Sequence, residues 1–420
     1  MGWALGLDFG TSAIKGIVVD PQGQIPYYQR LPLTDPASPQ QWQERLWELL
    51  AGLPPSVRCH LQHIGIAGTS GTVLLTDATG QPVAPVLMYN DSRGGFLLPE
   101  LKSYVPENHL VYSATSSLTK LFWYHHQGMP LSDKYLVHQA DWLGFLLHGK
   151  LGISDEHNAL KLGYDPEARA YPDWFQELPF AVRLPQVLVP GMPVGTIQPS
   201  IAQRFHLPPD CQIHAGTTDS IAAFIASGAQ QIGDGVTSLG STLVLKLLSQ
   251  QRIDDPATGV YSHRLGNLWL VGGASNTGGA VLTHFFTAEE LGNLSTQINP
   301  DVCIDFDYYP LLKPGERFPV NDPHLAPRLE PRPENPVHFL QALLTAMARI
   351  EAQGYQVLQH LGAPALQRVF TSGGGSHNSA WQAIRQRILG VPVQVAAQQE
   401  AAWGVARLAQ GITTCQQAQG

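Results

Sequence analysis

The stretch Asp8-Phe9-Gly10-Thr11-Ser12 lies between two short apolar runs, residues 3–7 and 14–19. Two such runs joined by a tight glycine turn predict a β-hairpin, because glycine adopts backbone conformations that other residues resist. Hydroxyl groups and backbone N–H groups at the tip of such a turn suit phosphate oxygens. The start of the chain is therefore expected to form two strands with a phosphate-binding turn between them.

A second turn of the same kind, Leu239-Gly240-Ser241-Thr242, occurs in the other half of the chain. Each turn belongs to a pattern of three strands, a helix and a fourth strand that ends in glycine. In the first half the helix follows Ser38-Pro39 and the fourth strand covers residues 64–67, whereas in the second half they cover about residues 336–361 and 369–370. The repeated order predicts two related α/β domains, residues 1–227 and 228–420, with a ligand site in the cleft between them.

The composition excludes several classes of protein. Charged residues make up only 14% of the 420 residues, the formal net charge is −8 and no dense Lys/Arg block occurs, so no nucleic-acid partner is expected. No apolar stretch has the length of a membrane span. The four cysteines lack metal or redox spacing and no signal peptide precedes the first strand, so we expect a cytoplasmic protein with reduced thiols.

Two aspartates are candidates for chemistry. Asp8 ends the first strand, where a carboxylate can hold Mg²⁺ while the metal bridges phosphate oxygens. Asp219 lies in Gly216-Thr217-Thr218-Asp219-Ser220 at the start of a predicted helix, where it can accept the proton of an attacking hydroxyl. The local sequence is also compatible with Asp8 as a turn cap and Asp219 as a helix cap.

A third glycine loop, Gly373-Gly374-Gly375-Ser376-His377-Asn378, joins a predicted strand to a helix that contains Trp381. Consecutive glycines let a flat ring approach the backbone closely, so Asn378 and Trp381 are candidates for contact with adenine. In the alternative interpretation, Asn378 caps the helix and Trp381 belongs to the core.

Signatures of other enzyme classes are missing from the sequence. It contains neither a Walker A motif nor a G-x-G-x-x-G motif that opens a βαβ unit. Gly68-Thr69-Ser70-Gly71 does not match the nucleophile elbow of serine hydrolases. The neighbouring histidines His60 and His63, and the pair His125-His126, lack further metal ligands.

Taken together, these stretches resemble the FGGY carbohydrate kinases, a family within the actin-like ATPase superfamily, over nearly the whole chain. Seven segments match family motifs in the expected order. They are residues 5–12 with Lys15, Tyr89-Asn90-Asp91-Ser92-Arg93, Asp141-Trp142-Leu143, Ser154-Asp155 with Asn158-Ala159, residues 215–220, residues 373–378, and Glu400 to Ala406. The resemblance implies an α/β fold of two ribonuclease-H-like domains with a cleft between them.

The resemblance also implies roles for individual residues in a reaction that uses ATP and Mg²⁺. Asp8 would bind Mg²⁺ and touch the sugar, Thr11 would hold the γ-phosphate, and Asp219 would deprotonate the attacking sugar hydroxyl. The nucleotide would be further surrounded by Gly10, Ser12, Gly240, Ser241, Thr242, Gly374, Gly375, Asn378 and Trp381.

The loop after the fourth strand narrows the expected substrate. Glycerol and xylulose kinases usually carry a Gln-containing motif there, whereas this chain has Gly68-Thr69-Ser70-Gly71-Thr72, which leaves Ser70 for a sugar hydroxyl. With the short chain length, this loop resembles a compact branch of D-ribulose kinases, so a ketopentose, and D-ribulose first, is expected. Xylulose or another polyol is the alternative within the family, and an actin-like ATPase without a sugar substrate is the alternative of a different class.

Overall fold

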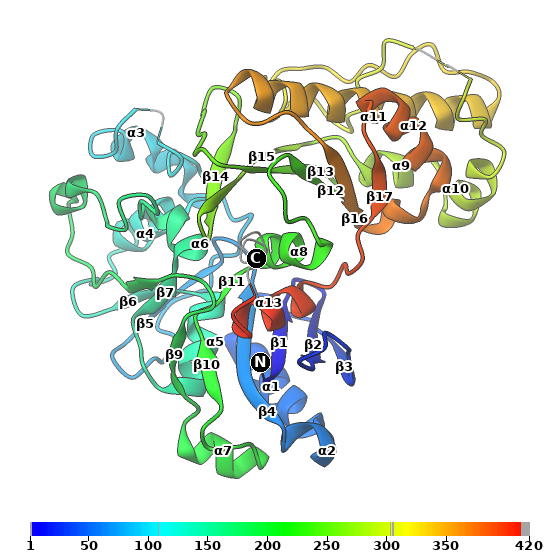
Figure 1. Cartoon of the computed structure of the whole chain (residues 1–420). Coiled ribbons are helices and arrows are strands. Elements are labelled where there is room, and N and C mark those ends of the chain that lie inside the picture. The colour runs from blue at the N-terminus through cyan, green and yellow to red at the C-terminus, as the bar shows by residue number, and fades with distance from the viewer. Residues whose placement is uncertain (1, 108, 303, 305, 413–420) are drawn as a thin grey trace. The chain divides into compact units, whose positions relative to one another are not determined.

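The computed structural model describes residues 2–107, 109–302, 304 and 306–412, which form two compact units (Figure 1). The first unit holds the described residues up to Ala226 together with those from Glu400 onward, and the second holds those from Ser227 to Gln399. No helix in the described part of the chain has both the length and the apolar character needed to cross a membrane.

The main sheet of the first unit has the strand order β3-β2-β1-β4-β10-β9, and β11 also pairs with β4. Its strands are β1 (Trp3–Phe9), β2 (Ala13–Val19), β3 (Tyr27–Pro32), β4 (Leu61–Gly68), β9 (Pro193–Thr196), β10 (Gln212–His214) and β11 (Thr217–Thr218). The strand β1 pairs antiparallel with β2 and parallel with β4. The predicted hairpin and fourth strand are confirmed.

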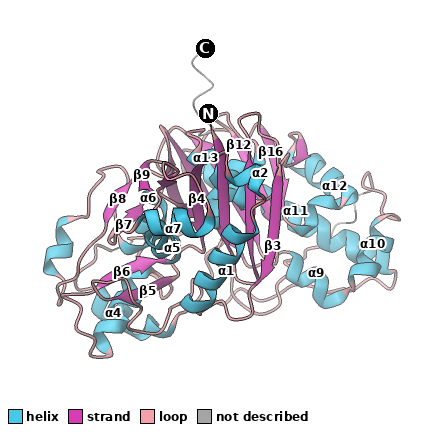
Figure 2. Ribbon diagram, turned by 90° about the horizontal axis from the view of Figure 1, so that it is seen from below, coloured by secondary structure: helices cyan, strands magenta, loops and turns pink. Residues whose placement is uncertain are grey.

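Helices α1 (Pro39–Gly52) and α5 (Gln139–His148) pack on one face of this sheet (Figure 2). Helix α1 begins as its sequence predicts, because Ser38 Oγ accepts a hydrogen bond from Gln41 N (3.2 Å) and Pro39 occupies the first turn. Trp42 of α1 and Trp142 of α5 meet edge to face, with ring centroids 6.2 Å apart, in the buried core.

The opposite face of the sheet is covered by α13 (Ala401–Ala409), a helix from the far end of the chain (Figure 1). A Cβ atom added to Gly6 of β1 would lie only 1.8 Å from Ala402 O, so helix and strand approach as closely as glycine permits. This helix was expected in a domain of residues 228–420, whereas by its packing it belongs to the first unit, because its small apolar residues complete the core of that unit.

The first unit also contains shorter elements, and those between residues 73 and 136 surround a separate apolar cluster. Strand β5 (Val73–Thr76) pairs with β6 (Tyr135–His138), and β7 (Ile153–Asp155) pairs with β8 (Gln186–Leu188). The remaining helices are α2 (Pro55–Arg58), α3 (Leu98–Leu101), α4 (Ser117–His126), α6 (Glu156–Ala159), α7 (Pro199–Phe205) and α8 (Asp219–Ser227).

The sheet of the second unit has the order β14-β15-β13-β12-β16-β17. Its strands are β12 (Asp234–Leu239), β13 (Leu243–Ser249), β14 (Tyr261–Leu265), β15 (Leu268–Ser275), β16 (Arg368–Ser372) and β17 (Val393–Val395). As in the first unit, a hairpin (β12-β13) leads to a third antiparallel strand (β15), and the first strand pairs in parallel with a strand that follows a helix (β16). The predicted repeat is confirmed, with β14 as an added edge strand.

The long helix α11 (Pro336–His360) packs with α12 (Ser379–Leu389) in the core of the second unit. A buried ion pair joins them, because Arg385 Nε lies 2.6 Å from Glu351 Oε2. Glu351 Oε1 also accepts a hydrogen bond from Thr237 Oγ1 of β12 (2.6 Å). Both helices are thereby fixed to the sheet. Two shorter helices, α9 (Gly279–Phe285) and α10 (Ala288–Ser295), precede α11.

Candidate active site

The two candidate aspartates lie at the same edge of the sheet in the first unit. Asp8 of β1 is opposite Ala67 of β4, and Ala67 is opposite Thr217 of β11 on its other side. Asp219 follows β11 directly as the first residue of α8. Because β1, β4 and β11 run parallel, their carboxyl ends meet at one edge, where ligands of α/β proteins commonly bind.

The environment of Asp8 disfavours a negative charge. The pKa of Asp8 is raised from 3.8 to about 7, mainly by burial and also by the carboxylate of Asp219. Lys15 acts in the opposite direction, but its Nζ lies 2.6 Å from Glu400 Oε2, and Glu400 itself raises the pKa of Asp8. The two aspartates are therefore close enough to interact, and the site holds an excess of negative charge.

One carboxylate oxygen of Asp8 fits a cation. Asp8 Oδ1 has no accessible surface and no hydrogen-bond partner among the residues that the structure describes. Within those residues, no group of three or more His, Cys, Asp or Glu side chains could hold a metal ion. Mg²⁺ suits such a site, because it is usually bound by one or two carboxylates together with water and substrate phosphates.

The turn between β1 and β2 presents hydroxyl groups beside Asp8. Thr11 and Ser12 are exposed and Gly10 is half-buried. The backbone of the turn is tied to the chain beyond β3, because Leu33 N donates to Ser12 O (3.1 Å). The predicted phosphate-binding turn is thus an accessible loop with a fixed base.

The loop after β4 is anchored by side chains from distant segments. Gln139 Oε1 accepts hydrogen bonds from Thr69 N (3.0 Å) and Thr69 Oγ1 (3.1 Å), and Lys161 Nζ donates to Ser70 O (3.1 Å). Ser70 is half-buried. Neither Gln139 nor Lys161 was predicted as a site residue, although Gln139 lies only two residues before the Asp141-Trp142-Leu143 motif.

A buried lysine supports the next part of this loop. Lys120 Nζ of α4 donates to Gly71 O (2.6 Å) and Met88 O (2.7 Å). The pKa of Lys120 is lowered to about 7, mainly by burial and also by the nearby charge of Lys161, while Asp91 opposes the shift. The role of Lys120 could not be predicted from the sequence, because the residues of α4 around it form no recognisable motif.

The motif around residues 154–159 positions the strand that precedes Asp219. Asp155 caps α6 by accepting hydrogen bonds from the backbone N–H groups of His157 (2.9 Å) and Asn158 (3.0 Å). His157 Nδ1 then forms a hydrogen bond of 2.7 Å with Thr217 Oγ1 on β11. All four side chains are buried. The histidine, which the sequence analysis did not single out, connects this motif to Asp219.

In the second unit, two of the predicted glycine loops lie at neighbouring strand ends. Ser238 of β12 is opposite Ser372 of β16, so the turn Gly240-Ser241-Thr242 and the loop that begins at Gly373 start side by side. Ser241 is exposed. A Cβ atom on Gly373 would lie 2.7 Å from Leu239 O, which leaves room only for glycine.

The structure favours the alternative interpretation of Asn378 and Trp381. Asn378 Oδ1 accepts a hydrogen bond from Trp381 N (2.9 Å) and so caps α12, while its Nδ2 donates to Ser295 Oγ (2.8 Å). Trp381 is only 2% exposed, and a Cβ atom on Gly375 would lie 2.6 Å from its ring. Trp381 is therefore a core residue that packs against the glycine loop.

Comparison with known proteins identifies kinases. A family profile described as "FGGY family of carbohydrate kinases, C-terminal domain" matches residues 235–410. The chain is 28% identical to a xylulose kinase of Streptomyces coelicolor, over 98% of this chain and 88% of the relative. It is 23% identical to a xylulose kinase of Escherichia coli, over 97% of this chain and 89% of the relative.

Solved structures of kinases share the fold. A xyloylose kinase from Brucella ovis has a TM-score of 0.85 at 22% identity, covering 98% of this chain and 91% of that chain. A xylulose kinase from Rhodospirillum rubrum has a TM-score of 0.81 at 22% identity, covering 97% and 89%. The predicted two-domain α/β fold of the actin-like ATPase type is confirmed. The matched domain, residues 235–410, places this part of the chain in the FGGY family of carbohydrate kinases.

Proposed function

We propose that this sugar kinase transfers the γ-phosphate of ATP to a hydroxyl group of a ketopentose, with Asp8 and Asp219 at the reacting centre. The observation that carries the proposal is the pair of interacting carboxylates at the ends of β1 and β11, one with a buried oxygen that has no hydrogen-bond partner. Phosphoryl transfer needs a cation for the phosphates and an acceptor for the proton of the attacking alcohol. Two carboxylates with different surroundings suit these two tasks.

Asp219 is proposed as the base that accepts the proton of the sugar hydroxyl. Its Oδ1 accepts a hydrogen bond from Ser220 N (2.7 Å), which orients the carboxylate at the start of α8. The positive end of the helix dipole favours a negative charge there. His157 and Thr217 hold the preceding strand, so the base has a fixed position.

Asp8 is proposed to hold Mg²⁺, which would neutralise charge on the transferred phosphoryl group when it is bound. Thr11 and Ser12 in the first unit, and Ser241 and Thr242 in the second, would donate hydrogen bonds to the phosphates. Gly374 and Gly375 would let adenosine approach the backbone, with Asn378 fixing the loop at the start of α12.

Two ketopentoses are supported by different observations. The relatives are named xylulose kinases, which favours D-xylulose. The loop Gly68 to Thr72 favours D-ribulose through its resemblance, with D-ribulose 5-phosphate as product. Purified protein with ATP and Mg²⁺ is to be assayed for ADP release against a panel of ketoses and polyols. The higher kcat/KM identifies the sugar, because discrimination is a ratio of these constants. ADP release that no sugar accelerates would instead indicate an ATPase.

The role of Asp219 is tested by Asp219→Ala. Loss of a general base typically costs about 10²–10⁴-fold in rate, so kcat is expected to fall by that factor while the affinity for ADP changes little. Near-normal turnover in this variant would overturn the assignment of Asp219 as the base.

A further inference from the structure

The turn Gly240-Ser241-Thr242 is supported from behind by the start of α9. Gly279 N donates to Gly240 O (2.8 Å), Ala280 N donates to Ser241 O (3.1 Å), and Leu243 N donates to Thr277 O (2.8 Å). These bonds hold the backbone of the turn while leaving its hydroxyl groups to a ligand. The shape of the turn therefore depends on where residues 276–280 lie.

Gly278 lets the two segments come this close. Its φ is +144°, and a Cβ atom there would lie 2.7 Å from Thr242 C and 2.8 Å from Ser241 O. A close approach without side-chain packing gives little stabilisation of its own. Residues 276–280 must therefore be held in place by contacts on the side that faces away from the turn.

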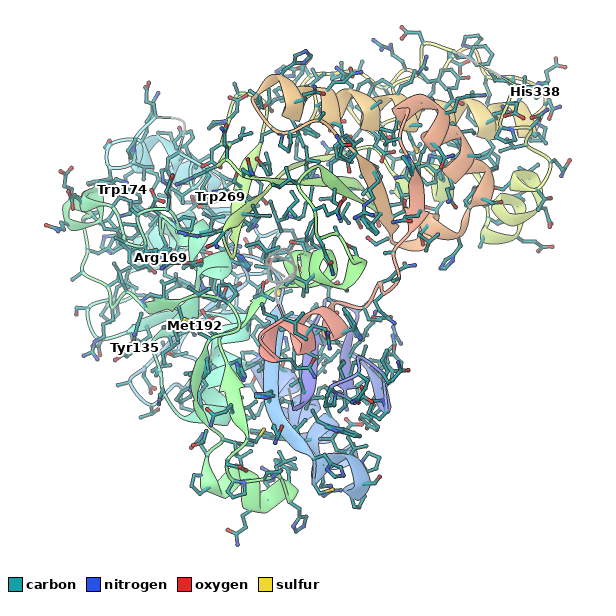
Figure 3. The ribbon with its side chains drawn as sticks, in the orientation of Figure 1. Tyr135, Arg169, Trp174, Met192, Trp269 and His338 are labelled. Carbon is teal, nitrogen blue, oxygen red and sulfur yellow. The ribbon has the colours of Figure 1, made fainter. Side chains whose placement is uncertain are left out.

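The buried carboxylate of Glu316 holds residues 276–280 in place behind the turn. Strand β15, on which Trp269 is labelled in Figure 3, ends at Ser275. Ser275 Oγ donates to Glu316 Oε2 (2.5 Å), and Asn276 N donates to Glu316 Oε1 (2.6 Å). Glu316 also accepts hydrogen bonds from Tyr309 OH (3.0 Å) and Arg317 N (2.8 Å), and it is only 2% exposed.

Further bonds connect the same two segments. Asn276 Nδ2 donates to Gly315 O (2.9 Å), Arg317 Nε donates to Asn276 Oδ1 (2.7 Å), and Thr277 Oγ1 donates to Pro310 O (2.7 Å). Burying a carboxylate is costly unless hydrogen bonds compensate it. Here four donors do so, of which Asn276 N belongs to the segment behind the turn and Ser275 Oγ to the residue directly before it.

We propose that Glu316 is a positioning residue for the phosphates of ATP, acting through Ser275 and Asn276 on the turn Gly240-Ser241-Thr242. The proposal rests on the proposed function of this turn. It gives the Pro-rich stretch of residues 308–335, which has few regular elements, the task of fixing the nucleotide side of the site. A loop displaced by about 1 Å can lose orders of magnitude in rate, so such support has a functional effect.

The experiment compares Glu316→Ala with Glu316→Gln in the full-length protein. Alanine removes all four acceptor contacts, whereas the glutamine amide oxygen can still accept from Asn276 N and Arg317 N. We expect Glu316→Ala to raise the KM for ATP and the Kd for ADP about tenfold or more, with the KM for the sugar changed less than about twofold. Glu316→Gln is expected to restore most of the affinity.

Asp234→Asn is the matched control. Asp234 is a buried acid of the same unit that accepts hydrogen bonds from Gln230 N and Gln231 N and pairs with Arg368. It lies at the opposite end of β12 from the turn. Its substitution is expected to lower thermal stability without raising the KM for ATP. Equal increases in the KM for ATP in Asp234→Asn and Glu316→Ala would overturn the proposal, because the effect would then be general loss of structure.

Amide hydrogen exchange gives a readout that does not depend on catalysis. Faster exchange is expected at Leu243, Gly279 and Ala280 in Glu316→Ala and, more weakly, in Ser275→Ala, which remains a test if Glu316→Ala does not fold. Unchanged exchange at these amides would overturn the proposal. If the wild-type protein phosphorylates no sugar, the proposed function fails, while exchange and ADP binding still decide the role of Glu316.

Discussion

Asp8 is proposed to hold Mg²⁺, but its surroundings disfavour the negative charge of its carboxylate. Burial and the neighbouring Asp219 both act against its negative charge, and Lys15 is paired with Glu400. Sites that bind ligands are commonly less stable than the surrounding fold for this reason. The raised pKa of Asp8, about 7 against 3.8, makes this conflict measurable.

We predict that Asp8→Asn stabilises the ligand-free protein while abolishing Mg²⁺-dependent sugar phosphorylation. The folded protein holds the Asp8 proton up to a pH of about 7, whereas the unfolded chain releases it near 3.8. The charge therefore destabilises the fold fully above pH 7 and hardly at all below pH 4. A shift of about 3 pKa units corresponds to roughly 4 kcal/mol, so the gain in free energy of unfolding is expected to reach at most about 4 kcal/mol at pH 8 and to be near zero at pH 4.

Thermal unfolding at both pH values checks this prediction, with Asp133→Asn as control. Asp133 is exposed and its pKa is lowered by its hydrogen bond to Lys134, so its loss should bring no gain at pH 8. A destabilised Asp8→Asn protein at pH 8 would contradict the argument.

Site residues differ in how well the sequence alone predicts them. Asp8 and Asp219 were predicted as candidates because each lies at a strand end beside glycine, a pattern confined to a few neighbouring positions. Glu316 was not predicted as a candidate, because its hydrogen-bond partners Ser275 and Asn276 are 41 and 40 positions away in the sequence. Its local surroundings are an irregular segment without periodicity. Only the folded structure brings these groups together.

At the scale of elements, the first hairpin and its covering helix depend on one close contact. Gly6 of β1 lies against the backbone of Ala402 in α13, with 1.8 Å between an added Cβ atom and Ala402 O. A backbone oxygen in a helix cannot move aside as a side chain can. The contact therefore fixes the distance between helix and sheet.

We predict that Gly6→Ala destabilises the first unit by about 3 kcal/mol, the upper range for overpacking a buried site. Gly292→Ala in α10 is the matched control, because an added Cβ atom meets nothing within 4 Å there and alanine favours helix. Urea unfolding of both variants measures the difference. If Gly6→Ala were as stable as Gly292→Ala, the close packing of α13 on β1 would be refuted.

The elements were predictable where a local pattern was strong. Turn residues between apolar runs predicted β1, β2, β12 and β13, and a helix was predicted over about residues 336–361, where α11 lies. The edge strand β14 was missed, because its five residues alternate only partly and its place depends on pairing with β15. Helix α13 was expected within residues 228–420, whereas it packs in the first unit, because a sequence does not show which element covers an apolar face.

At the scale of the whole molecule, the two units share one sheet topology. The first unit is completed by α13, the last helix along the described chain. The chain leaves the first unit after Ala226 and returns at Glu400. Seven of the nine residues of α13 are buried, and Ala4, Ile17 and Val19 lie beneath them. A fragment that ends at the predicted boundary therefore lacks one layer of its core.

We predict that residues 1–227 alone fold poorly, although they contain the whole sheet of the first unit. Loss of α13 removes roughly 5 kcal/mol of apolar burial by area, a large part of the stability of a typical domain. A fusion that joins residues 400–412 to this fragment through a flexible linker is expected to restore cooperative unfolding and to reduce binding of an apolar dye. Both fragments are compared by circular dichroism during heating. Cooperative unfolding of residues 1–227 at the temperature of the fusion would mean that the return of the chain is dispensable. The boundary predicted from the sequence would then be the physical one, because the first unit would not need α13 to close its core.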